Sequence, residues 1–197
     1  MPLEPVRQTD SPRSANHLAA VVTYHMNMQA PAMLILSGLP GTGKTTFALA
    51  LAAHTPVVHL ESDAIRRALF SVPAYVPAEH ARVFRTLEAH GAKALAGGQD
   101  VIVDATNLAA NERRRFVRIA EAANAMVVLV RFTAPEVVIR ERLTVPREGS
   151  SQADFRVYEM MRARANSLRS AAVVVDSRFD LSPSLDLVLL LMHDQEE

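Results

Sequence analysis

The chain has 197 residues, 49% of them hydrophobic, which suits one medium-sized domain with a substantial core. The 21 basic and 21 acidic side chains balance, so no global field attracts nucleic acid or an anionic membrane, although a local basic groove is compatible with this balance. The absence of cysteine excludes disulfides, thiolate chemistry and Cys-based zinc sites, and it fits a reducing cytoplasm. No apolar run is long enough to span a membrane.

Residues 1–30 are expected to form a flexible or weakly ordered extension ahead of one folded domain over residues 31–197. Prolines lie among polar residues at the start, and no helical or strand period is clear before Ala15. The apolar stretch 18–22 lacks the basic start and full length of a signal peptide. A later translation start is an alternative, at Met26, Met28 or Met33.

Short apolar segments alternate with helical segments along the rest of the chain. The predicted strands are 32–37, 56–60, 100–104, 126–132 and 172–175. The predicted helices are 46–53, 63–69, 78–96, 111–123, 135–143, 153–170 and 183–192, with Ser62 or Asp63 and then Asn111 as candidate N-caps. Strands that alternate with helices predict right-handed crossovers and a five-stranded parallel sheet in a three-layer α/β/α sandwich.

The most informative motif lies between the first strand and the first helix. Residues 38–45, GLPGTGKT, fit G-x-x-x-x-G-K-[ST], the phosphate-binding loop of P-loop nucleotidases. Glycines let backbone N–H groups point at an anion, Lys44 adds charge for the outer phosphates, and the Thr45 hydroxyl can bind Mg²⁺. A chance glycine-rich loop is the alternative. We therefore predict a site for ATP and Mg²⁺ at Gly38, Pro40, Gly41, Thr42, Gly43, Lys44, Thr45 and Thr46.

A carboxylate and an arginine follow the second strand. Because ligands bind at the carboxyl ends of parallel strands, Asp63 and Arg66 are expected to share a crevice with the phosphate loop. Asp63 could accept a proton from an acceptor hydroxyl, and Arg66 could bind the acceptor or the phosphoryl group. The alternative is an N-cap aspartate with a solvated arginine one turn later. The loop around 71–78 and the helix after it are expected to bind the acceptor.

The third strand ends in Asp104, a position from which a carboxylate can hold Mg²⁺ through water. Asn107 follows, and its side chain could bind the acceptor or tie the loop down. The alternatives are a turn residue for Asp104 and an Asx-turn for Asn107.

Arginines also surround the end of the helix after the fourth strand. Arg142 and Arg147 are predicted to stabilise the transferred phosphoryl group from a loop that closes over ATP, whereas Arg140 is predicted to lie on the surface. A solvated basic helix end is the alternative. The cluster 113–115 with Arg118 is interpreted as a solvated helix face, and contact with a phosphate backbone is the alternative. No metal-binding spacing occurs among the histidines, which are interpreted as surface or filler residues: His54, His59, His80 and His90.

The ordered set of motifs resembles the P-loop kinases related to polynucleotide kinase and zeta-toxin-like small-molecule kinases, often labelled AAA-type ATP-binding domains. The segments that carry the resemblance are GLPGTGKT, Ser62-Asp63-x-x-Arg66, and 101–107, VIVDATN, with further similarity around Arg142 and Arg147. It covers residues 33–192 and implies a P-loop NTPase fold with a helical lid. No phosphatase or ligase module accompanies these motifs.

The resemblance also implies residue roles. In polynucleotide kinases the Asp of D-x-x-R is the general base and its Arg contacts the acceptor-side phosphate, which implies these roles for Asp63 and Arg66. The lid arginines stabilise the transferred phosphate, which implies that role for Arg142 and Arg147. The family's Asp-x-Asn corresponds to Asp104 and Asn107, here with one residue more between them.

These expectations define a kinase that transfers the γ-phosphoryl group of ATP to a hydroxyl. The acceptor is a small molecule or a nucleic-acid 5′ end, and neutral charge without an aromatic stacking platform favours the small molecule. The alternative is a nucleotide-dependent ATPase or switch that acts through a protein partner, although no obligate partner is evident. A degraded relative that only binds nucleotide is a third hypothesis, which the presence of Lys44, Thr45, Asp63 and Asp104 opposes.

Overall fold

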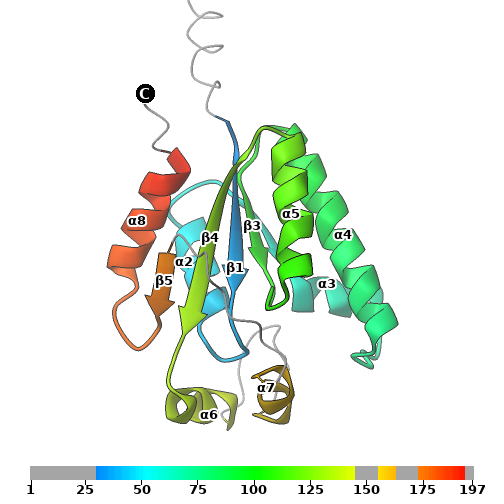
Figure 1. Cartoon of the computed structure of the whole chain (residues 1–197), viewed down its shortest axis with the longest axis vertical. Helices are drawn as coiled ribbons and strands as arrows, with labels where there is room; N and C mark the ends of the chain where they lie inside the picture. Colours follow the sequence, from blue (N-terminus) through cyan, green and yellow to red (C-terminus); the bar gives the residue numbers. More distant parts are fainter. Residues whose placement is uncertain (1–29, 145–154, 163–172, 194–197) are drawn as a thin grey trace, which may run out of the picture.

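Five parallel strands form the central sheet of this computed structural model, in the order β2-β3-β1-β4-β5 (Figure 1). The structure describes residues 30–144, 155–162 and 173–193. The strands are β1 (Ala32–Ser37), β2 (Val58–Glu61), β3 (Val101–Asp104), β4 (Met126–Thr133) and β5 (Val173–Asp176). The predicted five-stranded parallel sheet is therefore confirmed, and the strand order is new information from the structure.

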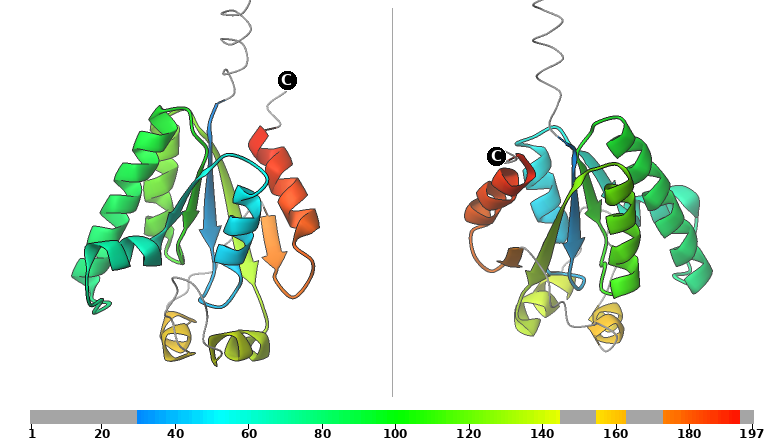
Figure 2. Two further views of the ribbon diagram at one scale, coloured as in Figure 1. Left: turned by 180° about the vertical axis from the view of Figure 1, so that it is seen from behind. Right: turned by 45° about the horizontal axis from the view of Figure 1, so that its top comes forward.

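Helices cover both faces of the sheet. Within the described residues they are α2 (Lys44–Ala52), α3 (Ser62–Leu69), α4 (Pro77–Ala96), α5 (Ala110–Ala122), α6 (Glu136–Thr144), α7 (Phe155–Arg162) and α8 (Ser182–His193). Figures 1 and 2 show α2 and α8 on one face and α4 and α5 on the other. Helices α6 and α7 lie beyond the carboxyl ends of the strands, as expected of a lid. The chain thus adopts an α/β P-loop NTPase fold.

The central strand β1 explains why its sequence is apolar without alternation. All of its residues are buried. Leu34 and Leu36 join the core beneath α2 and α8, whereas Met33 and Ile35 join the core beneath α4 and α5. A strand with helices on both faces needs apolar side chains at every position, and this continuous run fixes β1 in the middle of the sheet.

Several helix starts differ by one or two residues from the predicted ones, and three of them show the physical reason. Helix α3 begins at Ser62 with Glu61 as N-cap, because β2 runs directly into the helix without a loop. Helix α5 has Ala109 as N-cap, so the predicted cap Asn111 lies in its first turn. The Glu112 carboxylate accepts the Ala109 N–H at 3.1 Å and supplies the cap that Asn111 was expected to give. Helix α4 begins one residue earlier than predicted, at Pro77, where the missing N–H costs no hydrogen bond.

Parts of the sequence-based prediction fall outside the described residues. The predicted extension 1–30 does so except for Ala30, and the predicted loop 145–152, which contains Arg147, does so entirely. The domain boundary at residue 31 stays a prediction. Among the helices that the structure describes, none is both long and apolar enough to cross a bilayer.

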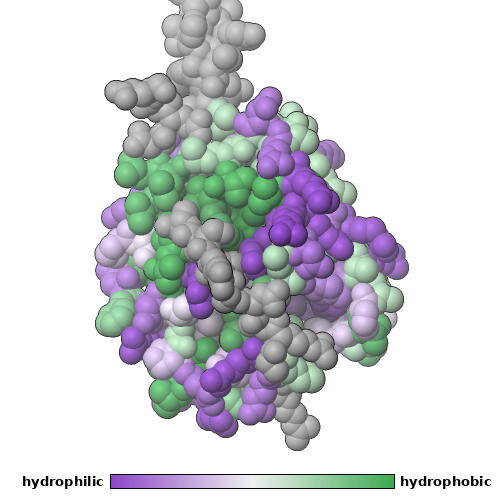
Figure 3. Space-filling model, in the orientation of Figure 1, coloured by the Kyte–Doolittle hydropathy of each residue, from purple (hydrophilic) through white to green (hydrophobic). Residues whose placement is uncertain are grey.

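The surface of α5 is strongly hydrophilic, as Figure 3 shows on the right side of the molecule. Arg114 and Arg118 are exposed there, in agreement with the predicted solvated face. Arg113 differs, because its guanidinium donates to the carbonyls of Asn107 at 2.8 Å and Leu108 at 2.7 Å. That side chain fastens the start of α5 to the loop after β3.

Candidate active site

The phosphate loop connects β1 to α2 and is shaped by its own backbone. Gly41 and Gly43 have φ angles of 80° and 90°, in the left-handed region that glycine adopts without strain. The Gly38 N–H donates to the carbonyl of Thr106 at 3.0 Å, which ties the loop to the segment after β3. The Thr42 hydroxyl donates to the carbonyl of Leu39 at 2.7 Å and closes the turn internally. The loop is therefore held in shape by contacts from two strand ends.

Lys44 lies inside this loop. Its ammonium group donates to the carbonyls of Gly38 at 2.9 Å and Leu39 at 3.1 Å, and the residue is only 9% exposed. Burial lowers the pKa of the Lys44 ammonium below its usual value, although the carboxylates of Asp104 and Asp63 act in the opposite direction. A bound anion would likewise favour the charged form, so Lys44 is suited to binding phosphate.

A cavity opens at the carboxyl ends of β1, β2 and β3 and brings most of the predicted site residues together. Its lining includes Lys44 and Thr45 of the phosphate loop, Asp63 and Arg66 of α3, and Asp104 of β3. Pro40, Gly41, Gly43 and Thr46 also contribute. Residues at the carboxyl ends of two strands therefore lie in one cavity with the phosphate loop, as expected from the sequence. We call this space the first cavity.

Asp104 is buried beside His59, which was predicted to be a surface or filler residue. Its Oδ2 is 3.2 Å from Nε2 of His59, and only 3% of the aspartate is exposed. Glu61 of β2 also lines the cavity; burial raises the pKa of the Glu61 carboxyl, and the negative charge of Asp104 adds to the rise. The partner of Asp104 was invisible in the sequence because 45 positions separate it from His59.

The oxygen groups at this place fit a magnesium ion. Mg²⁺ prefers hard oxygen ligands and is usually held by one or two protein groups together with substrate phosphates. The Thr45 hydroxyl and the Asp104 carboxylate both line the first cavity and supply such groups. Within the described residues no cluster of three or more histidine, aspartate or glutamate side chains could hold a metal by itself.

Arg66 is unusually buried for an arginine, with 7% of its surface exposed. Its Nη1 is 3.7 Å from Oε2 of Glu79, and its guanidinium carbon lies 4.8 Å from the centre of the Tyr75 ring. Its Nε and Nη1 have no hydrogen-bond partner in the described part of the chain. The predicted alternative of a solvated arginine is therefore wrong.

Asn107 is the predicted substrate ligand whose position requires a correction. It is fully buried, its Nδ2 donates to the carbonyl of Leu36 at 2.7 Å, and it does not line the first cavity. The Ser37 hydroxyl donates to its carbonyl at 3.1 Å. Its φ angle of 43° is one that asparagine tolerates better than most residues. Asn107 thus holds the loop after β3 against β1, which is the second of the two roles considered.

A second cavity lies on the other side of the phosphate loop. It is lined by Gly41, Gly43 and Thr46, which also line the first cavity, and by Arg142, Ser177 and Leu181. Arg142 of α6 donates to the carbonyl of Gly41 at 3.1 Å and to the hydroxyl and carbonyl oxygens of Ser177, both at 2.7 Å. The structure thus brings Arg142 to the loop.

Arg140, predicted to lie on the surface, is exposed and pairs with Glu136 at 3.4 Å. The predicted partner of Arg142, Arg147, lies outside the described residues.

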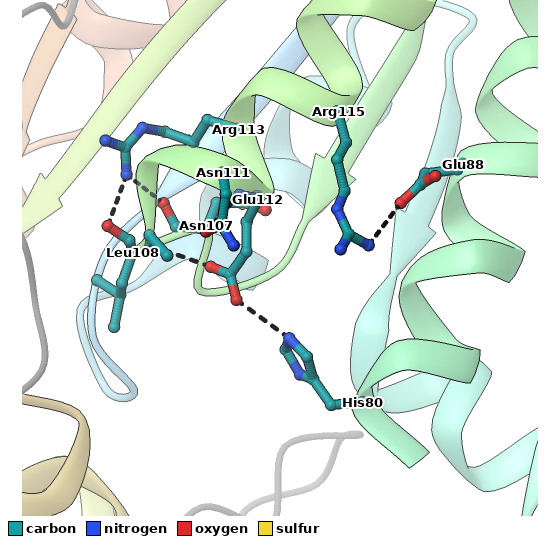
Figure 4. A network of polar contacts seen from close by, with 9 residues as sticks. His80, Glu88, Asn107, Leu108, Asn111, Glu112, Arg113 and Arg115 are labelled. Carbon is teal, nitrogen blue, oxygen red and sulfur yellow. Dashed lines mark hydrogen bonds and ion pairs between the residues drawn. The ribbon is translucent and has the colours of Figure 1, made fainter. Parts of the chain in front are cut away.

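Several residues of the first cavity carry no sequence motif. Figure 4 shows the polar network beside it, in which His80 of α4 faces Glu112 of α5. His80, Tyr75 and Phe84 line the cavity, as do Val157 and Met161 of α7. The expectation that the loop around 71–78 and the helix after it bind the acceptor covers Tyr75, His80 and Phe84, whereas no site prediction included Val157 and Met161.

Comparisons with known proteins agree with this geometry. A family model described as an AAA domain matches residues 33–168. No curated protein sequence matches the chain. Among solved structures, the APS kinase of Mycobacterium tuberculosis in complex with AMPPNP and APS is similar over 82% of this chain and 97% of its own, with 17% identity and a TM-score of 0.64.

Two further solved structures are similar. A sugar kinase from Janibacter sp. HTCC2649 matches over 82% of this chain and 94% of its own, with 21% identity and a TM-score of 0.59. A gluconokinase from Sinorhizobium meliloti 1021 matches over 83% and 93%, with 19% identity and a TM-score of 0.59. At these identities the similarity establishes the fold alone, the α/β P-loop NTPase fold.

Proposed function

The chain belongs to the AAA domain family, and on this premise we propose that it is an ATP-dependent kinase that transfers the γ-phosphoryl group to a hydroxyl of a small molecule. One observation carries the proposal. Lys44, Asp63, Arg66 and Asp104 come from three different elements and line one cavity beside the phosphate loop. A phosphate-binding cation, a carboxylate base and a metal-binding carboxylate are the groups that this transfer needs.

The two cavities suggest where each of the two substrates binds. The phosphate loop separates them, since Gly41, Gly43 and Thr46 line both. We place the nucleoside of ATP in the second cavity, beside Arg142 and Ser177, and its phosphates over the loop toward the first. The guanidinium of Arg142 then adds positive charge next to the phosphates. Arg147 keeps its predicted role in stabilising the transferred group.

The first cavity would then receive the acceptor. Asp63 accepts the proton of the acceptor hydroxyl or orients it, and Arg66 binds the acceptor or the transferring phosphoryl group. Thr45 and Asp104 would hold Mg²⁺, which neutralises developing charge on the phosphates when bound. Lys44 contributes a positive charge within the loop, from a buried position where screening by water is weak.

Within the kinases, we place the chain among relatives of polynucleotide kinase and zeta-toxin-like enzymes, on the D-x-x-R motif of Asp63 and Arg66. A cytoplasmic location stays a prediction. The three solved kinases named above have names that refer to small-molecule substrates, which supports a small-molecule acceptor over a nucleic-acid 5′ end.

The central experiment replaces the proposed base. Asp63→Asn keeps the shape of the side chain but removes its ability to accept a proton at neutral pH, so phosphoryl transfer should fall by 10²-fold or more, at the lower limit of about 10² to 10⁴ for general bases. Affinity for ATP, measured by calorimetry, should change little. Full transfer activity in the variant would show that Asp63 is not the base.

A screen with radiolabelled ATP tests the activity itself. Label transfer to nucleosides, sugars or other small alcohols supports the proposed kinase. Transfer to oligonucleotide 5′ ends would instead show that the acceptor is a nucleic acid. ATP hydrolysis with no transfer to any acceptor, stimulated by a protein partner, would instead establish the nucleotide-dependent switch.

A further inference from the structure

Part of the first cavity is apolar and comes from elements without a recognised motif. Phe84 of α4, Val157 and Met161 of α7, and Tyr75 from the loop before α4 line this part, which we call the apolar wall. The charged residues Lys44, Asp63, Arg66 and Asp104 line the rest. An acceptor made only of hydroxyl groups would leave this wall without a matching surface.

His80 brings a polar ring to the apolar wall. Its side chain is 44% exposed, so a ligand in the cavity can reach it. The ring packs on Phe84 with centroids 4.3 Å apart and planes inclined by 35°. Its Nε2 lies 3.0 Å from Oε1 of Glu112, a contact drawn in Figure 4. Two neighbours thus restrict the orientation of the ring.

Glu112 is itself fixed and charged. Its Oε2 accepts the N–H of Ala109 at the start of α5. Burial acts to raise the pKa of Glu112, but hydrogen bonds from His80 and Ala109 outweigh this effect and leave the pKa below its usual value. An ionised carboxylate only accepts hydrogen bonds, so Nε2 of His80 must carry a proton. In the neutral ring Nδ1 is then an acceptor.

The remaining nitrogen of His80 is available to a ligand. In the part of the chain that the structure describes, Nδ1 has no hydrogen-bond partner. We propose that His80 is a specificity-determining residue that accepts a hydrogen bond from the acceptor through Nδ1, with Glu112 as its positioning residue. This inference rests on the proposed kinase function and names the class of acceptor for the same cavity.

The acceptor class follows from the combination of surfaces. The hydroxyl to be phosphorylated lies toward Asp63, a planar apolar portion lies against Phe84 and Met161, and an O–H or N–H on that portion meets His80. A ring-bearing alcohol with a second hydrogen-bond donor satisfies all of these contacts. A polyol satisfies the charged part of the cavity but leaves the apolar wall uncovered.

Matched probes test this assignment. Wild-type protein would be assayed with 4-hydroxyphenethyl alcohol, with phenethyl alcohol, which lacks the ring hydroxyl, and with sorbitol, which lacks the ring. The expected order of kcat/KM is the order in which they are named, with about a tenfold advantage from the ring hydroxyl. A preference for sorbitol, or no advantage from the ring hydroxyl, would overturn the proposed class.

Substitution of His80 tests the residue. His80→Phe keeps an aromatic ring on Phe84 but removes both nitrogens, so the KM for 4-hydroxyphenethyl alcohol should rise about tenfold while its kcat and the KM for ATP change little. The KM for phenethyl alcohol should not rise. Equal effects on both alcohols would show that His80 has only a packing role.

The same two helices provide a control. Glu88 of α4 and Arg115 of α5 form an exposed ion pair at 3.1 Å, visible beside the His80 pair in Figure 4, and neither residue lines the cavity. Glu112→Gln should raise the KM of the hydroxylated alcohol severalfold, because an amide no longer enforces the protonated Nε2. Glu88→Gln should leave it unchanged; an equal rise would mean that loosening α4 and α5 is the cause.

Direct binding separates this inference from the proposed function. Binding of the alcohols would be measured by ligand-observed NMR with wild type and His80→Phe, independently of turnover. Binding that depends on His80 and the ring hydroxyl, without any transfer, would support the inference while the kinase function fails. Transfer with binding that ignores His80 would overturn the inference and leave the kinase function standing.

Discussion

The two sides of the phosphate loop are built in different ways. On the side proposed to bind ATP, the donor side, the loop backbone would supply the binding groups, and its shape depends on glycines with φ angles of 80° and 90°. On the proposed acceptor side, side chains from α3, α4, α5 and α7 and from the loop before α4 meet around the first cavity and the network beside it. A site made by a continuous backbone turn leaves a motif in the sequence, whereas one made by side chains from separate elements leaves almost none.

The largest expected effect tests the backbone side. Gly43→Ala would place a Cβ 3.0 Å from Cβ of Ser177 at a residue whose φ is 90°. The loop must shift to accommodate it, so kcat/KM for ATP should fall on the order of 10²-fold, as expected when a phosphate is misplaced by about 1 Å. Steady-state kinetics with varied ATP would measure the change.

Gly98→Ala is the matched control for that substitution. Gly98 has a φ of 71°, but no atom lies within 4 Å of an added Cβ, and the residue is remote from the loop. The variant should lose roughly 1–2 kcal/mol of stability from backbone strain and keep its kinetics for ATP. If it lost activity as Gly43→Ala does, general strain rather than loop geometry would explain both results.

A smaller effect should appear on the acceptor side. Glu79 accepts the N–H groups of Ala74 and Tyr75 at 2.9 and 2.8 Å and faces Arg66 at 3.7 Å. Glu79→Gln removes the charge that holds Arg66 and loosens the loop that carries Tyr75. We expect the KM for the acceptor to rise about tenfold with an unchanged KM for ATP.

The control for Glu79 is a surface glutamate with an arginine partner. Glu88→Gln breaks the surface pair with Arg115 and should alter neither KM. A rise of the KM for ATP in Glu79→Gln would mean that the donor and acceptor sides are coupled through the phosphate loop. The two sides could then not be treated as independent.

The smallest effect on catalysis is expected at Asn107. Asn107→Ala leaves the buried carbonyl of Leu36 without its donor, so the free energy of unfolding should fall by about 1–3 kcal/mol. The KM for the acceptor should stay as in wild type, because the side chain does not line the first cavity. Urea denaturation and acceptor kinetics together would distinguish this structural role from the substrate contact first predicted.

The position of the phosphate loop and the sheet could be predicted from the sequence because their signals are local. Strand β1 was expected at residues 32–37 and is found there, since a doubly covered strand is apolar at every position. The start of α5 was less predictable. Asn111 is a good capping residue by type, but Glu112 reaches back to the Ala109 N–H, and the helix begins one residue earlier.

The missed residues share a different cause. His59 and His80 were interpreted as surface or filler residues because neither has a metal-binding spacing, yet each meets a carboxylate from a distant part of the chain. Such pairs depend on strand order and on the packing of α4 against α5, which periodicity does not encode. Arg66 was expected near the phosphate loop for a topological reason, and its burial against Glu79 could not be anticipated.

The contact between α6 and the phosphate loop has a consequence for exchanging parts between related proteins. An added Cβ at Gly41 would lie 3.0 Å from Ile139 and 3.3 Å from Leu143, so α6 lies directly on the turn. Arg142 adds a hydrogen bond to the Gly41 carbonyl. A chimera that imports a foreign α6 would therefore need to import the matching glycine loop as well, because the two segments form a single interchangeable module.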